Sequence, residues 1–79
     1  MRRLPPLRSL EAFLRIARLG SAKAAASELA LSPSALSRRI ATLEEFVGKK
    51  LFRRYNQQLR LNEAGEAFYA GIAPAVDAL

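Results

Sequence analysis

The stretch Leu31-Ser32-Pro33-Ser34-Ala35-Leu36-Ser37-Arg38-Arg39-Ile40 decides how this chain folds. Ser32 is a natural helix cap, because its hydroxyl can accept a hydrogen bond from a backbone N–H of the first turn. Pro33 then takes the first helical position, where its missing N–H costs nothing. The sequence therefore predicts a helix that begins at this Ser-Pro pair.

This helix is predicted to run over about 33–47, and its two faces differ. An apolar stripe recurs at steps of four, three and four residues, and Gly48 ends it. The stripe is Leu36, Ile40, Leu43 and Val47. The opposite face carries Ser34, Ser37, Arg38 and Ala41. Small, hydrogen-bonding side chains let a helix enter the major groove of DNA, so this face predicts a recognition helix.

Two helices precede it. The first, over about 6–19, follows two prolines and ends at Gly20, and its apolar face is Leu7, Leu10, Phe13, Leu14 and Ala17. Ser21 caps the second, an alanine-rich run over about 22–30 with small side chains at 24–26 that another helix can approach closely. Two helices joined through residues 30–32 form the layout of a helix-turn-helix.

A hairpin and one more helix complete the chain. Residues 51–55 and 59–61 read as short strands joined by 56–58, with Asn56 favoured at positive φ. Asn62 caps a last helix, which Pro74 should kink. The expected fold is mainly α: a winged helix-turn-helix of three helices plus a small β-hairpin wing over 1–61, followed by a linker helix over 62–79. A seam with coiled-coil spacing runs along that helix through Gly65, Tyr69, Ile72, Val76 and Leu79.

The composition excludes several kinds of chemistry. The 79 residues include no cysteine and no histidine, so thiolate or imidazole metal sites and the usual general bases are missing. Glu44 and Glu45 are the one conceivable acid–base pair, but adjacent helical residues do not face each other. No apolar run is long enough for a signal peptide or a membrane span. We therefore expect a cytoplasmic protein that is no enzyme and has no cofactor, metal or membrane partner.

Charge is divided unevenly along the chain. All thirteen Lys and Arg lie within residues 2–60 against four Glu, a formal charge of +9, whereas residues 61–79 carry three acids and no base. A basic head suits a polyanion, whose counterions are released on binding, and an acidic tail suits solvent or a protein partner. The competing interpretation of the basic head is a surface that is merely soluble.

The candidate contacts to DNA follow from these elements. Arg38 is the first choice for reading a base, because a guanidinium pairs bidentately with guanine, and the hydroxyls of Ser34 and Ser37 are more permissive. Arg39 points about 100° away and is either a phosphate contact or a solvated charge. Arg53, Arg54 and Arg60 on the hairpin can reach a DNA backbone or a narrow minor groove. Weaker candidates, for phosphates, are Lys23 and the Lys49-Lys50 pair. The hairpin arginines could instead guard a soluble edge strand, and the whole domain could instead dock a protein.

The order of these features resembles the N-terminal domain of LysR-type transcriptional regulators. The resemblance covers nearly the whole chain, is most specific over 32–40, and extends at its start to the glycine-cleavage-activator subgroup. It rests on Leu7-Arg8-Ser9-Leu10-Glu11-Ala12-Phe13, Gly20-Ser21, Ala25-Ala26, the opening decapeptide, Leu43-Glu44, Gly48, Leu51-Phe52 and Leu61-Asn62-Glu63-Ala64-Gly65.

The resemblance implies a bacterial regulator that binds double-stranded operator DNA. Its contacts would come from Ser32, Pro33, Ser34, Ser37 and Arg38, with Arg54 in the wing. The linker helix would form a homodimer through Tyr69, Ile72, Val76 and Leu79 and set two recognition helices roughly 34 Å apart. Family members continue into a domain of two α/β lobes that senses a small molecule. An effector would therefore act only through that missing C-terminal domain.

Five positions depart from the family pattern. Ala22 stands where an aromatic is usual, and Phe46 replaces a typically polar residue. Ala22 removes an aromatic from the packing between the first two helices unless Phe13 or Phe46 fills the space. Phe46 is either such a compensating core residue or an exposed patch at a subunit contact. Pro33-Ser34 replaces the commoner Gln-Pro, so base preference cannot be transferred, and Gln57 stands where many wings have a basic residue.

Overall fold

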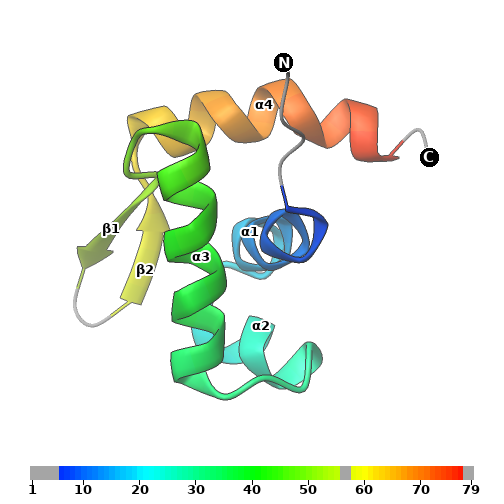
Figure 1. Ribbon diagram of the computed structural model, residues 1–79, viewed down its shortest axis with the longest axis vertical. Coiled ribbons are helices and arrows are strands. Elements are labelled where there is room, and N and C mark those ends of the chain that lie inside the picture. The colour runs from blue at the N-terminus through cyan, green and yellow to red at the C-terminus, as the bar shows by residue number, and fades with distance from the viewer. Residues whose placement is uncertain (1–5, 56–57, 78–79) are drawn as a thin grey trace.

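The computed structural model describes residues 6–55 and 58–77, with side chains except those of residues 73 and 75–77. Its elements follow in the order α1 (Leu7–Leu19), α2 (Ala22–Glu28), α3 (Pro33–Val47), β1 (Phe52–Tyr55), β2 (Gln58–Leu61) and α4 (Glu63–Asp77). Figure 1 shows α4 crossing one end of α3 while α2 lies at the other end, with the two-stranded hairpin beside α3. The predicted winged helix-turn-helix with a following helix is confirmed.

The helix boundaries are set by the residues that the sequence predicted as caps. Ser21 Oγ and Ser32 Oγ each accept a hydrogen bond, at 3.1 Å, from the backbone N–H three residues on. Asn62 Oδ1 does the same for α4 at 2.7 Å. Gly20 and Gly48 end α1 and α3 in the left-handed conformation, at φ 71° and 85°, which glycine adopts without steric cost. Because a cap bonds to a residue only three positions away in the sequence, it can be predicted before the fold is known.

Phe13 of α1 is the centre of the core. Its ring makes edge contacts with Phe52 of β1 at 5.5 Å and with Phe68 of α4 at 5.2 Å, and lies 6.5 Å from the Tyr69 ring. Around it, α2 buries Ala25 and Ala26, and α3 buries the predicted stripe except for Val47, which is half-buried. One aromatic side chain therefore joins α1 to the wing and to α4.

Some local predictions are wrong. Helix α2 ends at Glu28 rather than Ala30, because Ala30 takes the left-handed conformation at φ 58° to turn the chain into α3. Leu7 is 79% exposed although Ser9 in the same turn is buried, and Ala24 is exposed as well. Gln58 pairs with Tyr55 and belongs to β2 rather than to the connection. Asn56, with its predicted positive φ, and Gln57 lie outside the described residues.

Helix α4 continues through Pro74 to Asp77, and its first half packs on the core of its own chain. Gly65 is buried against the backbone of Leu51, and Tyr69 and Ile72 are half-buried against the core. The predicted seam thus starts on the face that packs inward. The Val76 side chain and Leu79, its other members, lie outside the described part of the chain.

Candidate nucleic-acid interface

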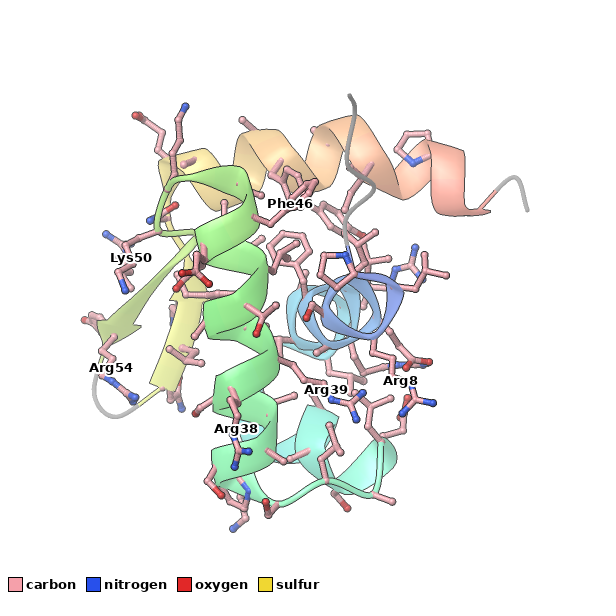
Figure 2. All side chains as sticks on the ribbon, viewed as in Figure 1. Arg8, Arg38, Arg39, Phe46, Lys50 and Arg54 are labelled. Carbon is pink, nitrogen blue, oxygen red and sulfur yellow. The ribbon has the colours of Figure 1, made fainter. Side chains whose placement is uncertain are left out.

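Helix α3 exposes a polar face opposite the stripe that it buries. Ser34, Ser37 and Arg38 are all exposed, while Leu36 and Ile40 beside them lie in the core. In Figure 2 the Arg38 side chain lies in front of the N-terminal half of α3. The predicted base-reading residues therefore stand on a rigid helix whose other face is fixed by packing.

The first turn of α3 uses one predicted contact residue structurally. Ser32 Oγ accepts the Ala35 N–H as the cap, and it also lies 3.3 Å from Ser34 Oγ, so one of the two hydroxyls donates to the other. Both side chains are nevertheless exposed. The hydroxyl of Ser34 is thereby held at the N-terminal end of α3.

A groove of about 570 Å³ lies between α2, α3 and the hairpin. Its floor is apolar, formed by residues such as Ala26, Leu36 and Leu59. Its walls bring together four of the predicted DNA contacts from three elements, namely Lys23, Pro33, Ser37 and Arg54. Two cations and a hydroxyl beside a groove can hold the sugar-phosphate backbone, whose oxygens accept hydrogen bonds and whose sugars are less polar.

The hairpin separates the three arginines that the sequence grouped together. Arg54 pairs with Leu59 and lines the groove, whereas Arg53 pairs directly with Arg60 on the other face of the hairpin. Arg53 and Arg60 line a different hollow, of about 250 Å³, beside the end of α1. Arg60 also lies over the Tyr55 ring at 5.7 Å and donates to Gln58 Oε1 at 3.3 Å. Only Arg54 of the three therefore joins the face made by α3.

Arg39 is also directed away from the groove. Its side chain is half-buried and lines, together with Arg38, a hollow that includes Ser9 of α1 and Thr42. Figure 2 shows it on the side of α3 toward α1, in the direction of Arg8. Neither Arg38 nor Arg39 lines the groove between α2, α3 and the hairpin.

The sequence did not reveal how the wing is attached to α3. Glu44 Oε2 accepts the backbone N–H of Leu51 at 2.8 Å, and Oε1 lies 3.8 Å from Lys50 Nζ. Asn62 Nδ2, from the start of α4, donates to the Lys50 carbonyl at 2.9 Å. The sequence does not predict this contact of Glu44, because helical spacing shows which face a residue occupies but not which backbone group it reaches.

Within residues 6–55 and 58–77, no group of His, Cys, Asp and Glu side chains could hold a metal ion. Of the helices described, none combines the length and the hydropathy that crossing a membrane requires.

The chain is similar to known regulators over most of its length. The family model for "Bacterial regulatory helix-turn-helix protein, lysR family" matches residues 7–66. The chain is 45% identical over 71 residues, 90% of its length, to the glycine cleavage system transcriptional activator of Escherichia coli K12 and to a homolog of that activator from Haemophilus influenzae. It superposes on the crystal structure "BenM_DBD/catB site 1 DNA Complex" with a TM-score of 0.82 and 29% identity, covering 92% of this chain and 82% of that one.

The two curated relatives are much longer than this chain, which spans 24% of the Haemophilus influenzae protein and 23% of the Escherichia coli protein. The matched residues run from the first residue of α1 to the first turn of α4 and so include the helix pair, the hairpin and the groove between them. The chain belongs to the lysR family of bacterial regulatory helix-turn-helix proteins.

Proposed function

We propose that this chain binds operator DNA sequence-specifically, as the DNA-binding domain of a bacterial LysR-type transcription regulator. The observation that carries the proposal is the convergence of Ser37, Arg54 and Lys23 on one groove beside the exposed face of α3. The BenM_DBD chain, which has the same fold, is named in its crystal structure as a complex with DNA, and this supports the proposal. The same proposal includes that the protein regulates a bacterial operator. It would then act in the cytoplasm and have no enzymatic activity.

Each element has a distinct role in the proposed complex. The exposed face of α3 enters the major groove, where Arg38 pairs with a guanine and Ser34 and Ser37 make permissive hydrogen bonds. One DNA backbone follows the groove between α3 and the wing, where Arg54 and Lys23 neutralise phosphates. The hairpin then lies at the flanking minor groove, where a narrow groove attracts arginine.

The proposed active species is a homodimer that joins two chains through α4. Tyr69 and Ile72 are only half-buried by their own core, so part of each side chain remains available to a partner. In the sequence, the coiled-coil spacing continues to Val76 and Leu79. Two recognition helices would then read a partly palindromic site with half-sites about one DNA turn apart, roughly 34 Å.

Selection of bound sequences from a random DNA library tests the proposal as a whole. We expect a short motif repeated with twofold symmetry, because an isologous dimer presents the same residues to both half-sites. Recovery of sequences without any shared motif would overturn sequence-specific binding. A domain that docks proteins would give that result, since its affinity for DNA would be generic to polyanions.

Arg38→Ala then tests the assignment of the base-reading residue. The loss of a bidentate contact should cost about 1–3 kcal/mol on the selected duplex and relax the preference at one position of each half-site. Titrations of both proteins at one salt concentration measure the loss, and a second selection with the variant identifies the position. Equal affinity and an unchanged motif would remove Arg38 from the reading face.

A further inference from the structure

The segment between α3 and β1 is held by a carboxylate from α3. The Glu44 side chain is only 12% exposed, and its Oε2 accepts the N–H of Leu51, which itself is 1% exposed and directly precedes β1. A charged acceptor makes a short, strong hydrogen bond. This contact is therefore a direct link from the recognition helix to the base of the wing.

The start of α4 holds the same segment from the other side. The Asn62 N–H donates to the Leu51 carbonyl at 3.0 Å, and Asn62 Nδ2 donates to the Lys50 carbonyl. The ion pair of Glu44 with Lys50 adds little, because the Lys50 side chain is 84% exposed and the two atoms are 3.8 Å apart. Of the described contacts to Leu51, only the Glu44 carboxylate ties its backbone to α3.

We propose that Glu44 is a positioning residue for DNA binding, which sets the wing, and through it Arg54, at a fixed distance from the reading face of α3. This inference rests on the proposed function. A two-stranded hairpin of four-residue strands has little stability of its own, so its place depends on what anchors its base. Without the carboxylate, the buried Leu51 N–H loses its acceptor and the base of the wing must move to find another.

If Glu44 acted on DNA only through its negative charge, its substitution would change the affinity for DNA in the opposite direction from that expected of a positioning residue. Removal of a negative charge from a DNA-binding face reduces repulsion of phosphates and so tightens binding. Loss of the anchor displaces Arg54 and weakens binding. Glu45 is the matched control, because it is the next residue, carries the same charge and is exposed.

The first experiment compares three variants of the 79-residue chain on the duplex obtained by selection, by fluorescence anisotropy. We expect Glu44→Ala to bind about tenfold more weakly, the scale of one positioned contact. Glu44→Gln, whose amide oxygen still accepts a hydrogen bond, and Glu45→Gln should stay within about threefold of the parent or bind more tightly. Tighter binding by Glu44→Ala would overturn the proposal.

A double-mutant cycle separates positioning from a general loss of stability. In the parent, Arg54→Ala should weaken DNA binding about tenfold. Added to the Glu44→Ala variant, the same Arg54→Ala substitution should weaken binding further by less than about twofold. Arg38→Ala should weaken binding by the same factor in both backgrounds. Equal losses for Arg54→Ala in the two backgrounds would overturn the proposal. Circular dichroism confirms that each variant is folded. If Glu44→Ala does not fold, Glu44→Met replaces it, because methionine has a side chain of similar length without an oxygen acceptor.

Hydrogen exchange gives a readout that needs no DNA. Exchange of the Leu51 amide, followed by NMR in the free protein, should be faster by about tenfold or more in Glu44→Ala and nearly unchanged in Glu44→Gln. Unchanged exchange in Glu44→Ala would overturn the anchoring role even if DNA binding is specific. If instead selection yields no motif while Leu51 exchange responds as expected, the proposed function fails and the anchoring of the wing stands.

Discussion

Gly65 lies where the first turn of α4 crosses the backbone that leads into β1. A Cβ added at this position would clash with the carbonyl oxygen of Leu51, which accepts a hydrogen bond from the Asn62 N–H, while the Leu51 N–H donates to Glu44. Because that segment cannot move freely, Gly65→Ala should lower the free energy of unfolding by about 1–3 kcal/mol. Chemical denaturation of the purified variant measures the change.

Gly71 provides the control in the same helix. A Cβ at Gly71 would meet nothing within 4 Å, and the residue is exposed. Gly71→Ala should therefore raise the free energy of unfolding by up to about 1 kcal/mol, the difference in helix propensity. Stabilisation by both alanine substitutions would show that α4 does not approach Leu51 closely.

Ala30 is the described non-glycine residue with a positive φ, at 58° in the turn between α2 and α3. A Cβ is strained in this conformation, so Ala30→Gly should stabilise the protein by about 0.5–1 kcal/mol despite the flexibility that glycine adds to the unfolded chain. Ala24→Gly, at an exposed helical position, should instead destabilise it by about 1 kcal/mol. Thermal unfolding of both variants compares the signs, and a loss of stability in Ala30→Gly would contradict the expected strain.

At the scale of single residues, local chemistry was predictable and distant contacts were not. Ser21, Ser32 and Asn62 could be identified as caps because each bonds to a residue three positions on. Ala30 gave no signal, since alanine is a good helix former and the turn imposes its conformation. The carboxylate of Glu44 reaches the backbone N–H of Leu51, which lies beyond the end of α3, so helical periodicity does not describe the contact.

At the scale of elements, the wing presents its arginines on two faces. Arg54 lines the groove beside α3, so Arg54→Ala should weaken DNA binding about tenfold and lower the slope of log K against log salt by about one. Arg53→Ala should weaken binding by less than about threefold, because Arg53 lies on the other face. Salt-dependent titrations of the two variants on one duplex make the comparison.

Arg53 and Arg60 are opposite each other on the ladder, and like charges in that arrangement repel. Arg53→Ala should therefore leave the free energy of unfolding unchanged or raise it by about 0.2–0.5 kcal/mol. An Arg53→Ala variant that loses as much affinity for DNA as Arg54→Ala would show that both faces of the wing contact DNA.

The sequence predicted that each helix and strand exists. It did not predict which residues of an element lie on which face of the molecule. The limits of α3 were predicted correctly at 33–47 because a cap, an apolar stripe and Gly48 agree. Their place on the hairpin predicted one role for Arg53, Arg54 and Arg60, although alternation along a strand places Arg53 and Arg54 on opposite faces. The groove that selects Arg54 exists only when α2, α3 and the wing have assembled.

At the scale of the molecule, charge and architecture divide the chain in the same place. Residues 1–60 contain all thirteen basic residues, and α4 begins at Glu63 and has two acids in its first turn. Figure 1 shows α4 at one end of the molecule and α2, which carries Lys23, at the other. DNA bound along α3 would therefore leave α4 free to meet a second copy without repulsion between two basic surfaces.

Salt dependence can test whether two chains act on one operator. Each phosphate that a chain neutralises contributes about −0.9 to the slope of log K against log salt. Two chains joined through α4 should thus give roughly twice the slope on a duplex with two half-sites that one chain gives on a single half-site. Anisotropy titrations between 50 and 200 mM salt measure both slopes, and sedimentation equilibrium gives the mass of each complex. A complex of one chain per duplex on both DNAs, with equal slopes, would refute the dimer, because a second set of phosphate contacts cannot form without releasing its counterions.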